Sequence, residues 1–347
     1  MLMTIRAVAR FCQNRIGWNR IAVALSVAII ATAAVVLYRM LHGIDFDDVV
    51  DAVMATHWQS VALAAVFVAA GYLTLTFYDL FALRTIGRRD IPYRVAALAG
   101  FTSYSVGHNV GATVFTGGAV RYRIYAPCGI DAIGVAKICF VAGLTFWLGN
   151  ATVLGLGIAY DPQAASAVDQ LPPWVNRLLA CVVLAALAAY VAWVWNGSRV
   201  IGRGAFQVTL PNGPNTLLQI FIGIIDLACC ALAMYTLLPG EPHIDFVSLA
   251  VVFVAATLLG FASHAPGGIG VFDAAMLFAL AQFDREDLIA ALLLFRLLYY
   301  ITPFTLALVI LGVREVAVGL GGVKSWLPPP RVKVAAPLKT EIDRDPA

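Results

Sequence analysis

The sequence predicts an all-α protein that crosses a membrane several times. The chain has 347 residues, of which 61% are hydrophobic and only 12% are charged, and its mean hydropathy is +0.86. A soluble domain carries roughly a quarter of charged residues. Six apolar stretches reach or approach the length of about 20 residues that a helix needs to cross a bilayer. They are residues 21–38, 60–83, 131–159, 174–196, 215–238 and 288–312.

The distribution of basic residues predicts the orientation of these spans. Loops rich in Arg and Lys stay in the cytoplasm. Most of the 23 Arg and Lys lie in the N-terminal head, near residues 84–94, 121–137 and 199–203, and in the C-terminal tail, whereas 39–59, 160–173 and 239–245 are mainly acidic. We therefore expect a basic cytoplasmic head at 1–20, a transmembrane domain at 21–315 and a disordered cytoplasmic tail at 316–347.

Two further apolar stretches, 92–118 and 245–281, are interrupted by glycine and proline. The first has basic residues on both flanks and the second has acidic or mixed flanks. Each is therefore expected to enter and leave the membrane on one side, so that the two form oppositely oriented re-entrant hairpins. Two broken segments in the two halves of a chain are typical of transporters built from inverted repeats. The alternative is a pair of ordinary kinked spans.

The first interrupted stretch combines glycines, which let a backbone approach a ligand closely, with polar side chains. Two arginines follow, and the planar guanidinium suits phosphate. We expect this segment to contact a lipid head group; the alternative for the arginines is that they only anchor the chain at the cytoplasmic surface. The candidate residues are Ser103, His108, Asn109, Gly117, Gly118, Arg121 and Arg123.

The second interrupted stretch predicts a short helix that opens on proline and glycine, with free N-terminal amides that favour an anion. An aspartate in its first turns binds there or simply caps the helix. A phosphate loop also needs Lys-Ser/Thr after the glycines, and none follows. The candidate residues are His264, Pro266, Gly267, Gly268, Gly270 and Asp273.

Ionisable residues inside spans are functional candidates because their insertion costs roughly 2.5–3.5 kcal/mol each at the bilayer centre. The four candidates are Asp79, Lys137, Asp226 and Arg296. Asp226 and Arg296 are predicted to lie at similar depth and to form an ion pair. The pair is either structural or part of a proton or counter-charge relay, with His108 and His264 as titrating partners.

Enzyme, cofactor and nucleic-acid functions are not expected. The chain contains no catalytic or dinucleotide-binding motif, and its six cysteines include no Cys-x-x-Cys pair, so that neither a cofactor nor a metal site is predicted. The net charge is only +3 and the basic residues are spread along the chain. A membrane enzyme acting on lipid head groups remains the alternative.

Two motifs resemble a known family. Gly117-Gly118-Ala119-Val120-Arg121-Tyr122-Arg123 and Pro266-Gly267-Gly268-Ile269-Gly270-Val271-Phe272-Asp273 occur in one polytopic chain. This resembles the membrane region of the lysyl-phosphatidylglycerol synthase, or multiple peptide resistance factor, family over roughly residues 15 to 315. Full-length members carry a soluble aminoacyl-transferase domain after that region, so this chain is expected not to synthesise the lipid itself.

The resemblance implies a flippase-type domain in a bacterial inner membrane, with both termini cytoplasmic. Its substrate would be aminoacyl-phosphatidylglycerol or a related phospholipid. Hopanoid or isoprenoid lipid transport is one alternative, and an accessory membrane subunit of a separate lipid synthase is another. The oligomeric state stays open.

Overall fold

The computed structural model describes residues 46–195, 197 and 199–319, and confirms the all-α polytopic fold. A single small sheet pairs β1 (Val200–Ile201) with β2 (Val208–Thr209). The helices are α3 (Phe46–Ala55), α4 (Trp58–Thr85), α5 (Tyr93–Val110), α6 (Thr113–Tyr125), α7 (Ala132–Tyr160), α8 (Pro162–Asp169), α9 (Pro173–Trp195), α10 (Gly213–Leu237), α11 (Phe246–Ala262), α12 (Val271–Ala279), α13 (Arg285–Arg296) and α14 (Thr302–Gly319), with short 3₁₀ turns η1 (Ala126–Cys128), η2 (Gly204–Phe206) and η3 (Pro266–Gly268) and a π-helical turn η4 (Leu297–Ile301).

Five helices in the described part of the chain are long and apolar enough to cross a membrane. Four of them are α4, α7, α9 and α10, and the fifth runs from Arg285 to Arg314 through α13, η4 and α14. They match five of the six predicted spans to within a few residues. The predicted span 21–38 and the head 1–20 lie outside the described residues, as does the predicted tail beyond Gly319; α14 itself continues four residues past the expected boundary at 315.

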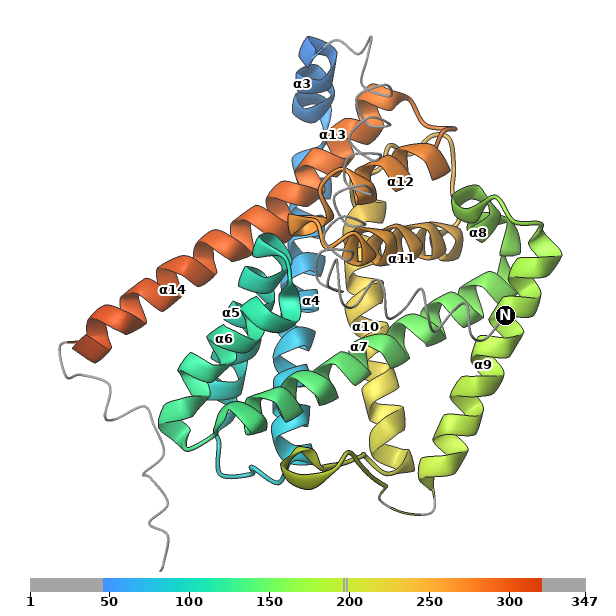
Figure 1. Ribbon diagram of the computed structural model, residues 1–347. Helices are drawn as coiled ribbons and strands as arrows, with labels where there is room; N and C mark the ends of the chain where they lie inside the picture. The colour runs from blue at the N-terminus through green and yellow to red at the C-terminus, as the bar shows by residue number, and fades with distance from the viewer. Residues whose placement is uncertain (1–45, 196, 198, 320–347) are drawn as a thin grey trace, which may run out of the picture.

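Helices α4, α7 and α10 form the centre of the molecule (Figure 1). Helix α10 runs antiparallel to α4, because Gly71 lies beside Cys229 and Cys230 whereas Tyr78 bonds to Asp226. The helices α7 and α10 cross at Gly149 and Gly223, where a Cβ on Gly149 would lie only 2.8 Å from the Gly223 Cα. Small residues at such crossings let membrane helices pack backbone to backbone.

The stretch 92–118 forms a helical hairpin, in which α5 and α6 pack against each other. Gly111 ends α5 with a φ of 81°, which favours glycine. The two ends of the hairpin lie together, because Arg88 before α5 donates to the carbonyl oxygens of Cys128 and Gly129 after α6 at 2.6 and 3.3 Å. This geometry agrees with a re-entrant hairpin and not with a kinked span.

The stretch 245–281 forms a second hairpin from α11 and α12, with η3 at its tip. Its tip meets the tip of the first hairpin: a Cβ on Gly111 would lie 3.3 Å from His264 O and 3.5 Å from the Pro266 Cα. Figure 1 shows the two hairpins reaching the middle of the molecule from different sides. Their opposed arrangement is what an inverted repeat produces.

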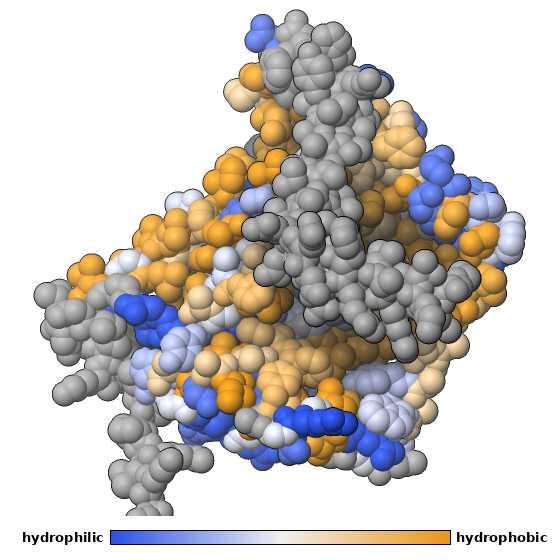
Figure 2. All heavy atoms as spheres, in the orientation of Figure 1, coloured by the Kyte–Doolittle hydropathy of each residue, from blue (hydrophilic) through white to orange (hydrophobic). Residues whose placement is uncertain are grey.

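The two ends of the helix bundle carry different charges. At one end the loops before α5 and between α9 and α10 carry Arg88, Arg89, Arg199 and Arg203. At the other end the loops after α7, α10 and α12 carry Asp161, Glu241, Asp245 and Asp284. Figure 2 shows an apolar band with hydrophilic residues along its lower edge. Basic loops favour the cytoplasmic side.

The topology predicts which loops share a membrane face. Single cysteines replacing Arg89 and Pro127, in a background without the native cysteines, should both react with an impermeant maleimide only after the cytoplasmic side is opened. Cysteines replacing His243 and Gln282 should react in intact cells. All four positions are exposed in the structure. Reaction of one member of either pair without the other would show that the hairpin between them crosses the membrane.

Candidate functional site

The first buried ion pair joins α4 to the second helix of the first hairpin. The Arg121 guanidinium on α6 donates to Asp79 through Nη2 at 2.7 Å and through Nε at 3.0 and 3.1 Å. Tyr125 OH donates to the same carboxylate at 2.8 Å, and the Arg121 Cζ lies 4.7 Å from the centre of the Tyr104 ring. The exposed fractions of Asp79 and Arg121 are 0% and 3%. Close geometry and additional hydrogen bonds are what a buried pair needs to offset desolvation.

Asp226 on α10 faces α4, and hydroxyl groups surround its carboxyl group. Tyr78 OH lies 3.0 Å from Oδ2, and Thr74 Oγ1 lies 3.2 Å from Oδ1. The residue is 5% exposed. The ion pairs identified among the described residues all lie elsewhere, so that no Arg, Lys or His of this part of the chain pairs with Asp226.

The two acidic sites are joined by aromatic side chains. Tyr104 lies between them, because its ring faces Arg121 and also contacts the ring of Tyr78 edge to face at 6.0 Å. We call this set the polar cluster; its members are Thr74, Tyr78, Asp79, Tyr104, Arg121, Tyr125 and Asp226. It connects the centre of α10 with the first hairpin.

The second ion pair joins the last span to the second hairpin. Arg296 at the end of α13 donates from Nε to Asp273 Oδ1 at 2.8 Å and from Nη2 to Oδ2, and its Nη1 donates to Gly267 O at 3.2 Å. Asp273 also accepts from the Gly270 amide at 2.9 Å and so caps α12. Each hairpin is therefore held to a full span by a bidentate Asp–Arg pair on its second helix.

The π-helical turn η4 lies where the hairpin tips meet the last span. Tyr72 OH on α4 donates to Tyr299 O at 3.0 Å, and Asn109 Nδ2 near the first tip donates to Tyr300 O at 3.1 Å. A π-helical turn interrupts the regular helical hydrogen-bond pattern and is frequent at functional sites. Here its carbonyl oxygens bind side chains of α4 and of the first hairpin.

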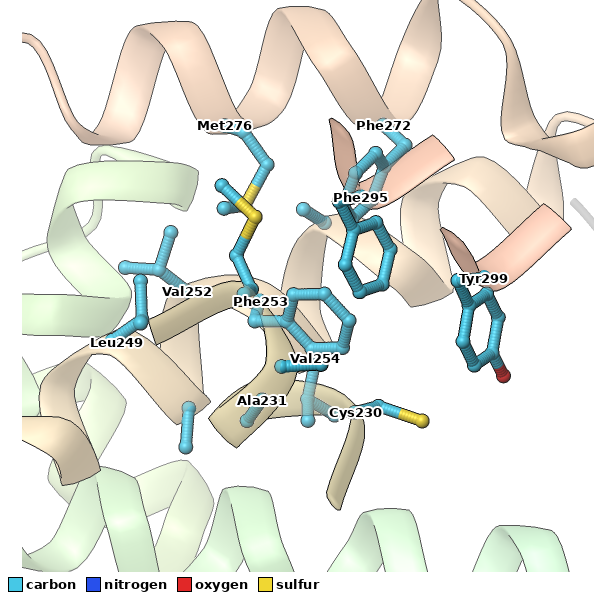
Figure 3. Packing of buried hydrophobic residues seen from close by; sticks show 14 of the residues in the cluster. Cys230, Ala231, Leu249, Val252, Phe253, Val254, Phe272, Met276, Phe295 and Tyr299 are labelled. Atoms are coloured by element: carbon cyan, nitrogen blue, oxygen red, sulfur yellow. The ribbon is translucent and has the colours of Figure 1, made fainter. Parts of the chain in front are cut away.

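Aromatic rings fill the space between the second hairpin and the last span. Phe253 contacts Phe272 and Phe295 edge to face, and Phe295 stacks on Tyr299 at 5.2 Å. Figure 3 shows these rings packed together, with Cys230 at the edge of the group. The second hairpin is therefore held by apolar packing as well as by its ion pair.

The predicted pairing of Asp226 with Arg296 is wrong. Asp226 faces α4, whereas Arg296 faces α12 and binds Asp273. The prediction compared only the depths of the two residues, and depth does not fix the direction in which a side chain leaves its helix.

No hydrogen bond joins either predicted histidine to Asp226 or Arg296 in the described part of the chain. The His108 ring stacks on Tyr299 and lies beside Tyr104, and its buried Nδ1 has no hydrogen-bond partner. His264 is exposed at the second tip, with Nδ1 2.9 Å from Ala262 O. His108 thus lies beside the polar cluster, and His264 lies away from it.

The residues predicted to bind a head group at the first tip do not gather at one place in the structure. Helix α6 continues to Tyr125, so that Gly117, Gly118, Arg121 and Arg123 all lie on this helix and not in a loop beyond the tip. Arg121 points inward to Asp79, whereas Arg123 is exposed. Ser103 is buried on α5, and its Oγ has no partner. A role of these residues in head-group binding stays a prediction.

At the second tip, a backbone amide that was predicted to be free for an anion is already hydrogen-bonded. Pro266, Gly267 and Gly268 form η3, and Gly270 precedes α12. The Gly270 amide binds Asp273 and is not open to an anion. Lys137 lies apart from both tips, where it lines a polar pocket of about 280 Å³ with Arg88 at the basic end.

A larger apolar cavity of about 680 Å³ lies between α7, α9 and α10, away from the hairpin tips. Its lining includes Leu156, Leu184, Leu187, Val191 and Leu217. None of the residues predicted to contact a head group lines this cavity among the described residues. Within the described residues, no group of three or more His, Cys, Asp or Glu is placed to hold a metal ion.

Comparison with known proteins identifies the family. The model of the lysylphosphatidylglycerol synthase transmembrane region matches residues 21–307. The chain belongs to this family. It is 30% identical to the Synechocystis protein slr0712 over 245 residues, which cover 70% of this chain and 76% of that protein. It is 27% identical to the inner membrane protein YbhN of Escherichia coli over 77% of this chain and 83% of the relative.

A third relative is a longer protein. The phosphatidylglycerol lysyltransferase of Staphylococcus aureus is 24% identical over 310 residues, which cover 86% of this chain but only 34% of the relative. The chain is thus a multi-pass membrane protein of a lipid-related family, and it matches about a third of the lysyltransferase.

The sequence reasoning missed the hydroxyl groups that surround the buried acids. Thr74 and Tyr78 are four residues apart and therefore share a helix face, and Tyr78 precedes Asp79. Polar side chains with this spacing inside an apolar span could have indicated a polar helix face. The sequence could not show that these hydroxyl groups face Asp226 of α10, whereas Asp79 binds Arg121 of α6.

Breaking the first ion pair should destabilise the protein strongly. Arg121→Gln leaves the buried Asp79 without its cation, and we expect a loss of about 3–5 kcal/mol in unfolding free energy. The double variant Asp79→Asn, Arg121→Gln should recover most of that loss. Thermal unfolding in detergent measures both. The more exposed pair Arg88–Asp90 is the control: Asp90→Asn keeps the bonds of Arg88 to the carbonyl oxygens of Cys128 and Gly129 and should cost at most about 1 kcal/mol. A double variant as unstable as the single one would contradict the assigned pairing.

Proposed function

We propose that the protein moves a phospholipid with an anionic phosphate head group between the leaflets of a bacterial inner membrane. The observation that carries this proposal is the meeting of two opposed hairpins tip to tip, each held to a full span by a bidentate Asp–Arg pair. Opposed broken segments are the arrangement used by transporters that expose one site alternately to the two sides. The family's lipid-related name and the lysyltransferase relative support a lipid as the substrate.

The Arg121 pair gives the proposal its chemistry. A guanidinium binds phosphate with the same two-point geometry that it uses for a carboxylate. A lipid phosphate can therefore replace Asp79 at Arg121, so that the arginine changes partners, while Asp79 keeps the bond from Tyr125 OH and is hydrated by the water that enters with the head group. The exchange would leave α6 less firmly bound to α4, which couples head-group binding to movement of the first hairpin.

The packed polar cluster corresponds to a closed state in this proposal. The first hairpin contacts the last span through the packing of α5 against α14, the bond from Asn109 to Tyr300 O and the stacking of His108 on Tyr299, and its Gly111 meets the second tip. These contacts must separate to open a path between the tips. The acyl chains would stay in the bilayer while the head group passes through the protein.

Three other functions would give different results in the reconstitution experiment described below. An isoprenoid phosphate shares the phosphate group, whereas a hopanoid does not need an arginine pair. A lipid-modifying enzyme would change the head group chemically. An accessory subunit would do neither without a separate synthase. We propose transport without chemical change, by a chain that is not itself an enzyme.

Reconstitution tests the proposal. Vesicles containing the purified protein and a fluorescent phosphatidylglycerol should expose inner-leaflet probe to an impermeant quencher faster than vesicles without protein, and the lipid should stay unmodified by mass spectrometry. Arg121→Lys should slow this exchange by about tenfold or more, because a point charge cannot replace the two-point bond and each lost charge-assisted bond is worth roughly 1.5–3 kcal/mol.

Arg89→Lys is the matched control, since Arg89 is an exposed residue of the basic end, and it should leave the exchange unchanged. Unaltered transport by Arg121→Lys would remove Arg121 from the path. A modified lipid would show an enzyme, and an inactive wild-type protein that is correctly folded would support an accessory role.

A further inference from the structure

The contacts of Asp226 with its neighbours require one more hydrogen than those neighbours can donate. The Thr74 hydroxyl lies 2.6 Å from Gly71 O and 3.2 Å from Asp226 Oδ1. A threonine hydroxyl has one hydrogen and can donate only once. The short contact with the Gly71 carbonyl needs that hydrogen, because a carbonyl oxygen cannot donate. The contact between Thr74 Oγ1 and Asp226 Oδ1 then joins two acceptors unless the carboxyl group itself carries a hydrogen.

Among the described residues, the neighbours of Asp226 offer no positive charge to stabilise a carboxylate. Helix α4 contributes Tyr72 and Tyr78, α5 contributes Tyr104, η4 contributes Tyr299, and α10 itself contributes Cys229 and Cys230. All of these groups are neutral or become negative on titration. The buried Asp79 and the partly buried Asp273 each bind an arginine. Asp226 therefore differs from them in charge environment.

We propose that Asp226 is a proton-binding site, whose carboxyl group donates to Thr74 Oγ1 and accepts from Tyr78 OH in the packed state. An isolated carboxylate in an apolar interior is strongly disfavoured, whereas a neutral carboxyl group with both oxygens bonded is not. When the polar cluster opens to water, the proton passes to a water molecule and leaves the carboxylate hydrated. Closing the cluster reverses this step, so that one proton is bound for each closure.

The proton site has a consequence for transport, and this step rests on the proposed function. Tyr78 and Tyr104 connect Asp226 to Arg121, where the lipid phosphate would bind. A phosphate and an ionised Asp226 in one closed cluster would repel each other. The cluster therefore closes over an anionic head group only with Asp226 protonated. Because the empty cluster also closes protonated, lipid movement requires a protonated Asp226 but carries no net proton.

Infrared difference spectroscopy tests the proton site without any lipid transport. Asparagine can keep both contacts, because its amide donates to Thr74 and its oxygen accepts from Tyr78, so that Asp226→Asn should fold like wild type. The spectrum of wild type minus Asp226→Asn at neutral pH should contain the C=O band of a protonated carboxylic acid. Carboxylate bands in its place would overturn the proposal. Asp273→Asn is the control variant, and its difference spectrum should show the carboxylate bands of an ion-paired acid.

Vesicles with the same pH inside and outside test this requirement. The exchange rate of fluorescent phosphatidylglycerol should fall as the pH rises for wild type, because fewer Asp226 carboxyl groups are protonated, and the rate should not depend on pH for Asp226→Asn. A wild-type protein that exchanges lipid at a rate independent of pH would overturn the requirement. A protein that exchanges no lipid would overturn the proposed function, while the infrared spectrum still decides the proton site.

Discussion

The Asp79–Arg121 ion pair is the interaction on which the arrangement of the first half of the molecule depends. Apolar side chains gain little by leaving lipid for the interior of a membrane protein, so that they do not specify which helix faces meet. A buried charge does specify them, because it is costly without its partner. Asp79 requires the inner face of α6, and Asp273 likewise requires the end of α13. Both hairpins are thereby placed by electrostatics.

In a re-entrant tip, the N–H and C=O groups of the irregular backbone must find hydrogen-bond partners within the protein. Side chains of the tips do this locally: Thr113 Oγ1 donates to Gly107 O at 3.1 Å and Thr116 Oγ1 donates to Gly111 O at 2.9 Å. At the second tip the Asp273 carboxylate receives the Gly270 amide, and Arg296 reaches Gly267 O. Of the donor side chains predicted at the first tip, Asn109 holds backbone through its bonds to Ser105 O and Tyr300 O, whereas Ser103 Oγ and His108 Nδ1 have no hydrogen-bond partner.

The sequence predicted the spans and hairpins well, because apolar length and the placement of arginines act along the membrane normal, a single direction. It predicted partners poorly. Arg296 binds Asp273 and not Asp226, and Arg121 binds Asp79, because partner choice depends on rotation about each helix axis and on which helices are neighbours. The tyrosines of the polar cluster were overlooked for a related reason. The sequence alone does not distinguish a tyrosine that packs as an apolar or interfacial residue from one whose hydroxyl group binds a carboxylate, as in Tyr78 and Tyr125.

The two hairpins belong to different apolar cores, and this difference bears on the movement that the proposed lipid transport needs. The second hairpin belongs to the large apolar core through Phe253, Phe272 and Met276, whereas the first hairpin packs mainly in a separate, smaller core with parts of α4 and α7 at the basic end. Its contacts with the large core come mainly from Phe101 and Tyr104. The bond between Arg121 and Asp79 can pass to a ligand, whereas apolar packing allows no such exchange of partners. In the transport that we propose, the first hairpin is therefore the element that moves, and the second hairpin is the fixed surface against which its tip closes.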